Sequence, residues 1–217
     1  MKKPAAAKGR RRRADPGAGT RQRLFAAAAT EFAARGFAGA NVDRIADAAR
    51  VNKAMLYYHF GSKSHLYGEI LRDMFGAVAA RLATSVDPGA DPAERVGALA
   101  EAIGREAEVR PHFPPIWLRE VAEGGAHLDK ATLGVIGGLL RHMETAVGDG
   151  VASGAFVPTN PFLVQLGIVG PLLLFFAARP MLTKAGPELG PALGLTTDQV
   201  IAHVQRVALQ TLEGKKP

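Results

Sequence analysis

Residues 36–67, GFAGANVDRIADAARVNKAMLYYHFGSKSHLY, decide the fold of this chain. Two short helices are predicted here, one after Asn41 and one after Asn52, because a side-chain amide oxygen caps a helix N-terminus well. A longer helix is predicted to follow Ser62. Two short helices that are joined by a tight turn and follow another helix form a helix-turn-helix unit.

The segment before this stretch predicts the helix that the unit requires. Thr20 is expected to cap it, Arg35 to end it and Gly36 to stop it. Its apolar residues recur every four positions, which is the spacing of one buried helix face. These residues are Leu24, Ala28 and Phe32.

The residues in this pattern resemble the tetracycline-repressor (TetR) family of bacterial transcription regulators. The most specific part is LYYHFGSKSHLY at residues 56–67. The resemblance covers about residues 20–67, and beyond them it is only architectural. The other matching residues are Gly36, Phe37, Val42, Ile45, Ala46, Ala49 and Val51.

The resemblance implies a DNA-binding domain at residues 20–67, with the third helix as its recognition helix. If Leu56 and Phe60 point inward, the residues between and before them lie on outer or flanking faces. Tyrosine, histidine and lysine suit phosphate contacts there, and Lys53 can read guanine. The predicted DNA-binding residues are Asn41, Arg44, Asn52, Lys53, Ala54, Met55, Tyr57, Tyr58, His59 and Lys63.

Two positions depart from the family pattern. Arg50 stands where the family often has glycine, and a left-handed backbone there costs a non-glycine residue about 1–2 kcal/mol. Asp43 stands early in the second helix, where a basic or polar residue suits DNA better. Its carboxylate can instead complement the helix N-terminus.

The charge of the chain is concentrated at one end. The 217 residues carry a formal net charge of +7, divided into +10 for residues 1–64 and −3 for the rest. Residues 1–19 are predicted to be a disordered basic arm, which either contacts DNA or is merely solvated. A polyanion is therefore the expected partner of the N-terminal third.

Residues 68–217 are predicted to be a helical ligand-binding and dimerisation domain, giving an all-α chain of about nine helices. Helices are expected over 91–109, 116–123, 128–153, from Pro161 and from Thr196 to about 213. By resemblance, a small molecule binds between these helices and the last two form the dimer. The pocket candidates are Phe113, Trp117, Glu120, Val135, Leu139, His142, Met143 and Gln165.

Several functions have no support in the sequence. The chain has no cysteine, so disulfides and thiol chemistry are excluded. It has no catalytic motif, no short-spaced histidine pair and no cofactor fingerprint, so no metal or cofactor is expected. The apolar segment 162–178 is expected to lie in a core or dimer interface and not in a membrane, because a spanning helix needs about 20 apolar residues.

We therefore expect a cytoplasmic, homodimeric transcription regulator, and in particular a repressor. It should bind a palindromic double-stranded DNA operator and be released by a small-molecule effector. The alternative is a helical small-molecule carrier or enzyme in which the basic arm is incidental.

Overall fold

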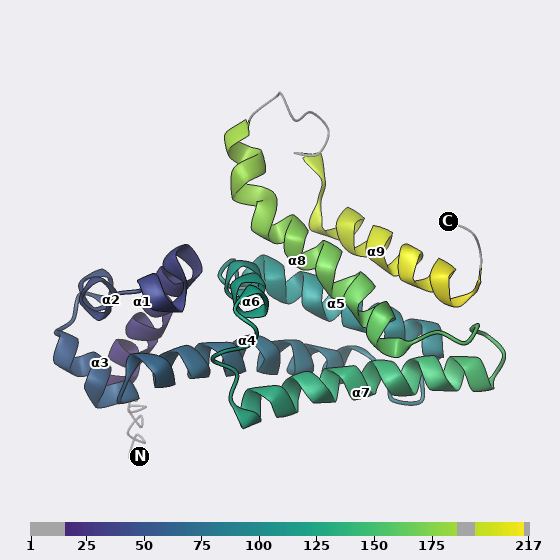
Figure 1. Ribbon diagram of the computed structural model, residues 1–217, viewed down its shortest axis with the longest axis horizontal. Coiled ribbons are helices and arrows are strands. Elements are labelled where there is room, and N and C mark those ends of the chain that lie inside the picture. Colours follow the sequence, from purple (N-terminus) through teal and green to yellow (C-terminus); the bar gives the residue numbers. More distant parts are fainter. Residues whose placement is uncertain (1–15, 186–193, 215–217) are drawn as a thin grey trace, which may run out of the picture.

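The computed structural model describes residues 16–185 and 194–214, and every regular element within them is an α-helix. Figure 1 shows a small N-terminal group of three helices and a larger helical body, joined by one long helix. This arrangement confirms the all-α prediction. The elements are α1 (Pro16–Gly39), α2 (Val42–Ala49), α3 (Lys53–Phe60), α4 (Lys63–Ser85), α5 (Pro92–Val109), α6 (Phe113–Ala122), α7 (Lys130–Ala152), α8 (Pro161–Ala185) and α9 (Thr197–Leu212).

The three N-terminal helices are held by a small apolar core and by side-chain caps. Asn41, Asn52 and Ser62 accept hydrogen bonds from backbone N–H groups in the first turns of α2, α3 and α4, as their spacing predicts. The core residues are each at most 1% exposed, and they fix the angles between α1, α2 and α3. They include Leu24, Phe32, Ile45, Leu56 and Phe60.

The start of α1 differs from the prediction, whereas its end agrees. The helix begins at Pro16 and not at Thr20, because proline is tolerated in a first turn, where the N–H groups have no intrahelical acceptor. The Thr20 hydroxyl accepts a hydrogen bond from Arg23 instead of acting as a cap. Helical geometry breaks at Gly36, whose φ is 69°. The charged residues of the predicted arm, 2–13, lie outside the described residues.

Arg50 ends α2 in the left-handed conformation, with φ 55° and ψ 48°. Within the described ranges it is the one residue other than glycine with a positive φ. Its N–H donates to the carbonyl oxygen of Asp47, which closes the helix C-terminus. Arg50, which stands where the family often has glycine, therefore adopts the left-handed backbone conformation that glycine adopts without strain.

Replacing Arg50 with glycine is expected to stabilise the N-terminal domain by about 1 kcal/mol, because glycine adopts this backbone without the Cβ penalty. Urea unfolding followed by circular dichroism measures the change. Arg50→Ala is the control, since it removes the charge and keeps the penalty. An equal gain from both variants would assign the effect to charge and not to backbone strain.

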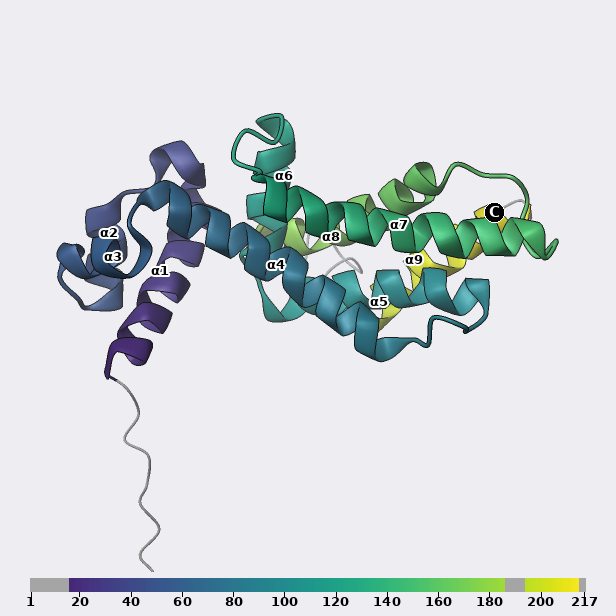
Figure 2. The ribbon, with the colours of Figure 1, turned by 90° about the horizontal axis from the view of Figure 1, so that it is seen from below.

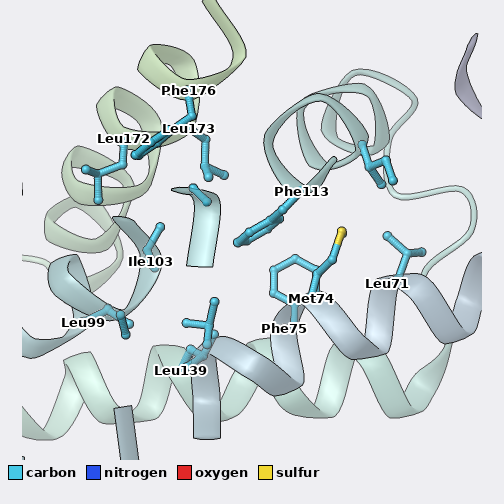
Figure 3. Close-up of a cluster of buried hydrophobic side chains, with 14 of the residues drawn as sticks. Leu71, Met74, Phe75, Leu99, Ile103, Phe113, Leu139, Leu172, Leu173 and Phe176 are labelled. Carbon is cyan, nitrogen blue, oxygen red and sulfur yellow. The ribbon is translucent and has the colours of Figure 1, made fainter. Parts of the chain in front are cut away.

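Helix α4 continues from the N-terminal domain into the body, so the predicted boundary after residue 67 falls inside a continuous helix. Figure 2 shows α4 running obliquely from the N-terminal helices into the body, alongside α7 and α5. The body is filled by apolar side chains from α4 to α8 (Figure 3), including Met74, Leu99, Phe113, Leu139 and Leu172. One hydrophobic core thus runs through both parts of the chain.

The predicted break at residues 110–115 is shorter than expected. Helix α6 begins at Phe113, so Pro114 and Pro115 occupy its first turn and not a loop. Since the first four N–H groups of a helix lack intrahelical partners, two prolines cost no hydrogen bond there.

A glycine allows close helix packing in α5, whereas three glycines of α7, namely Gly134, Gly137 and Gly138, do not have this role. A Cβ at Gly104 would lie 2.5 Å from Cγ1 of Ile201, so this glycine lets α9 approach α5. Nothing lies within 4 Å of such a Cβ at Gly134, and Gly137 and Gly138 face only the Arg141 side chain.

Helix α8 is long and apolar enough to cross a membrane, with a mean hydropathy of 2.0. The sequence predicts that it lies in a core or a dimer interface, and in the single chain only part of its surface lies in the core. Ile168, Leu172 and Leu173 face the core, but Leu163 and Leu174 are 61% and 63% exposed. One apolar face of α8 is therefore uncovered.

Candidate nucleic-acid interface and ligand cavity

Helix α3 presents a polar and aromatic face to solvent. Leu56 and Phe60 are buried as predicted, and the residues on the opposite side are open. Tyr57 is 47% exposed and Tyr58 is 79% exposed, so neither ring is needed to fill the core. Lys53 also lies on this face. Such a face can donate hydrogen bonds and contribute positive charge to a groove lined by phosphates.

Lys53 is paired with Asp43, the acid that the sequence predicts to complement the N-terminus of its helix. Its ammonium lies 2.9 Å from Oδ1 of Asp43, which is in the first turn of α2. The hydrogen bond and the charge of Asp43 raise the pKa of Lys53 above its ordinary value. The first turns of α2 and α3 therefore form one surface with a positive and a negative group side by side.

Three other predicted DNA-binding residues have internal partners. The Asn41 and Asn52 side-chain oxygens cap helices, which leaves their amide N–H groups for other contacts. The Arg44 guanidinium lies 2.6 Å from Glu31 and donates to the carbonyl oxygen of Gly39. These bonds hold α1 against α2, so these residues shape the surface as well as belonging to it.

Lys63 also bonds within the domain. Its ammonium donates to the carbonyl oxygens of Phe37, at 2.9 Å, and Ala40, at 3.1 Å. It also lies 4.5 Å from the centre of the Phe37 ring. Lys63 thus ties α4 to the end of α1.

The other predicted members of the surface differ in exposure. His59 and Met55 are half-buried, and Nε2 of His59 is buried without a hydrogen-bond partner among the described residues. Ala54 is exposed. The outer face of α3 therefore comprises Lys53, Ala54, Tyr57 and Tyr58.

A cavity of about 250 Å³ lies inside the body, between α4, α5, α6, α7 and α8. Figure 3 shows Phe75, Phe113, Leu139 and Leu173 pointing toward a common centre. Four of the eight predicted pocket residues line it: Phe113, Trp117, Leu139 and Gln165. The remaining lining residues are Phe75, Val78, Leu99, Ile103, Val121, Ile136, Phe162, Leu166, Val169 and Leu173.

The other four predicted residues do not line this cavity. Val135 and His142 face an open groove between α4 and α7, because they lie on the outer side of α7. Met143 is fully buried in the core, and Glu120 points from α6 toward α4. From the α8 wall the prediction included Gln165 and missed residues 162, 166, 169 and 173, although these have helical spacing.

The cavity is apolar except for one amide. Gln165 is the polar residue of its lining, and its side-chain oxygen is buried without a hydrogen-bond partner among the described residues. Trp117 packs edge-on against Phe75, with ring centres 4.8 Å apart. Such a site favours an apolar molecule with a hydrogen-bond donor, because a buried unpaired acceptor is costly.

Glu120 forms a buried link between α6 and the N-terminal domain. It is 0% exposed, and its carboxylate accepts hydrogen bonds from the Tyr67 hydroxyl at 3.0 Å and the His127 N–H at 2.6 Å. Burial and the adjacent carboxylate raise the pKa of Tyr67, which keeps its hydroxyl protonated as a donor. The Phe37 ring packs on His127, with centres 4.1 Å apart.

Among the described residues, this link also includes three side chains whose ligand atoms lie close enough together to hold a metal ion. One ligand atom each from Glu120, Glu123 and His127 lie within 4.8 Å of one another. The oxygens of Glu120 already accept hydrogen bonds from Tyr67 and His127. These hydrogen bonds explain the proximity of the three side chains without a metal ion.

The two faces of α6 thus touch two different regions. Phe113, Trp117 and Val121 line the cavity, whereas Arg119 donates to the carbonyl oxygen of Ala34 at the end of α1. A displacement of α6 by a molecule in the cavity would therefore act directly on the N-terminal domain.

Comparisons with known proteins agree with this geometry. A model of bacterial regulatory proteins of the tetR family matches residues 24–70. The HTH-type transcriptional repressor SCO4008 of Streptomyces coelicolor is 43% identical over 74 residues, which are 34% of this chain and 37% of that protein. The HTH-type transcriptional regulator RutR of Escherichia coli is 25% identical over 203 residues, 89% of each chain.

A solved structure also matches nearly the whole chain. The ketosteroid transcriptional regulator KstR2 of Mycobacterium tuberculosis has a TM-score of 0.70 and 25% identity, with 91% of this chain and 95% of that chain covered. Residues 24–70 match the helix-turn-helix region of the tetR family of bacterial regulatory proteins, and the fold of the chain resembles that of a solved transcriptional regulator.

Proposed function

We propose that this protein is a ligand-responsive transcriptional repressor of the cytoplasm that binds a palindromic operator as a homodimer. The observation that carries the proposal is the position of α6. One face of this helix lines an apolar cavity, and the other holds the helix-turn-helix domain through Arg119 and Glu120. A small molecule in the cavity and DNA on the helix-turn-helix domain would therefore favour different positions of α6.

The DNA contacts would come from the outer face of α3 and the first turn of α2. Lys53 and Tyr58 would lie nearest to base edges, while Tyr57, His59 and Lys63 would contact the backbone. Residues 1–19 would add positive charge, all of it in the part of the chain that the structure does not describe. Deleting residues 1–13 would then flatten the dependence of affinity on salt.

The homodimer would form through the uncovered apolar face of α8, together with α9. Phe162, Leu163, Leu166 and Leu174 are each more than half exposed on α8, and Phe162 and Leu166 also line the cavity, so this face adjoins the cavity. Clustered exposed leucines of this kind mark interaction sites. A second copy with its own α8 face would cover them symmetrically and place two α3 helices about 34–36 Å apart.

Replacing Leu174 with glutamate is expected to convert the dimer to a monomer, because the interface would bury two unpaired carboxylates about its axis. Light scattering measures the mass, and an operator titration should show at least a tenfold loss of affinity. Leu133→Glu is the matched control, since Leu133 is 52% exposed on α7. A dimer that survives Leu174→Glu would place the interface elsewhere.

The effector would be a compact apolar molecule with one hydrogen-bond donor, held against Gln165. Binding would change the fluorescence of Trp117, the single tryptophan, which lines the cavity. A compound library screened by this signal, followed by an electrophoretic shift with the DNA upstream of the gene, tests the proposal. A chain that shifts no duplex DNA would refute it.

A further inference from the structure

The carboxylate of Asp43 occupies a position that DNA should disfavour. It lies in the first turn of α2, its side chain is 61% exposed, and it adjoins the first residue of α3. An exposed ion pair with Lys53 contributes little to stability, so the pair is not needed for folding. A negative group that faces phosphates would weaken DNA binding. The Asp43 carboxylate is therefore expected to face a group on the DNA that donates hydrogen bonds.

The major groove offers few such partners. A carboxylate only accepts hydrogen bonds, and the donors on the major-groove edges are the amino groups of cytosine and adenine. The Lys53 ammonium only donates, and guanine gives it two neighbouring acceptors, O6 and N7. In a thymine–adenine pair, the acceptor O4 lies beside a methyl group, which suits an ammonium poorly.

The spacing of the protein groups matches that of a guanine–cytosine pair. Asp43 Oδ1 and Lys53 Nζ are 2.9 Å apart. Guanine O6 and cytosine N4 are hydrogen bonded to each other, so they also lie about 2.9 Å apart. A donor beside an acceptor on the protein thus faces an acceptor beside a donor on the base pair.

We propose that Asp43 and Lys53 together read one guanine–cytosine pair in each operator half-site. Lys53 donates to guanine O6 and N7, and Asp43 accepts from the amino group of cytosine. The inference rests on the proposed DNA-binding function and adds its base specificity. It also explains Asp43, which departs from the family pattern, as a residue that recognises a base and does not merely repel phosphates.

Replacement of Asp43 with alanine separates two explanations, namely repulsion of phosphates by the carboxylate and recognition of a base by the carboxylate. If the carboxylate only repels phosphates, Asp43→Ala binds every sequence more tightly, with unchanged preferences. If it reads cytosine, the variant has a weaker preference at one symmetric base pair and keeps the others. In that case the penalty for replacing this pair falls below the wild-type value of about 5- to 150-fold, and the preference that remains is that of Lys53 alone for guanine.

Selection of duplexes from a random pool by the full-length chain tests the proposal. We expect the wild type to enrich a palindrome with an invariant guanine–cytosine pair in each half, and Asp43→Ala to enrich that pair less strongly while every other position is unchanged. Asp47→Ala is the matched control, because it removes an exposed acid one turn further along α2. It should keep every preference.

Three results would overturn the inference. They are a wild-type palindrome without such a pair, a thymine–adenine pair at the position that depends on Asp43, and an Asp43→Ala variant with unchanged preferences. A wild type that enriches no duplex would refute both this inference and the proposed function. Thermal unfolding of the variants confirms that each is folded.

Discussion

Replacing both Tyr57 and Tyr58 with alanine is expected to lower operator affinity by about 100-fold and to leave the protein folded. The two rings are 47% and 79% exposed, so their removal opens no cavity. Each lies on the outer face of α3, where it would contact a phosphate or a base edge. Such contacts contribute about 1–3 kcal/mol each.

Fluorescence anisotropy with a labelled operator measures the loss, and urea unfolding measures stability. The Tyr57→Phe and Tyr58→Phe pair separates hydroxyl contacts from ring contacts. We use the tyrosines and not Lys63, because the Lys63 ammonium also bonds to Phe37 and Ala40, so its removal would loosen the domain. Undiminished affinity in the double alanine variant would move the interface away from α3.

Replacing Glu120 with alanine is expected to lower the free energy of unfolding by roughly 3 kcal/mol. The change leaves the buried Tyr67 hydroxyl and the part-buried backbone N–H of His127 without their acceptor, and an unpaired buried donor costs about 1–3 kcal/mol. It also weakens the attachment of α6 to α4. Operator release by an effector should therefore become less complete, even where binding in the cavity persists.

Glu123→Ala is the matched control, because this neighbouring side chain is 44% exposed and should change stability by less than about 0.5 kcal/mol. Urea unfolding of both variants gives the comparison. Equal losses in the two variants would contradict the central role of the buried carboxylate.

The N-terminal domain was largely predictable from sequence because its signals are local. Caps at Asn41, Asn52 and Ser62 act within three residues, and the inward positions follow a 3.6-residue period. The strained turn at Arg50 could also be predicted, since a left-handed end is common where a helix stops. The start of α1 was missed because proline can both interrupt a helix and begin one.

The cavity was only half predictable because it depends on contacts between distant helices. Phe113 and Trp117 adjoin a conspicuous proline pair, but nothing local tells which side of α7 faces inward at Val135 or Leu139. The Tyr67–Glu120 bond joins residues 53 positions apart, and Asp43 and Lys53 come from different helices. Such pairs require the tertiary arrangement.

A molecule in the cavity is expected to lower the affinity of the protein for DNA through α6. The direct measurement is an anisotropy titration of the operator with and without a compound that saturates the Trp117 signal. We expect the operator dissociation constant to rise by about 5- to 150-fold, and expect Glu120→Ala to reduce that ratio. A compound that saturates the Trp117 signal and leaves operator affinity unchanged would contradict the account.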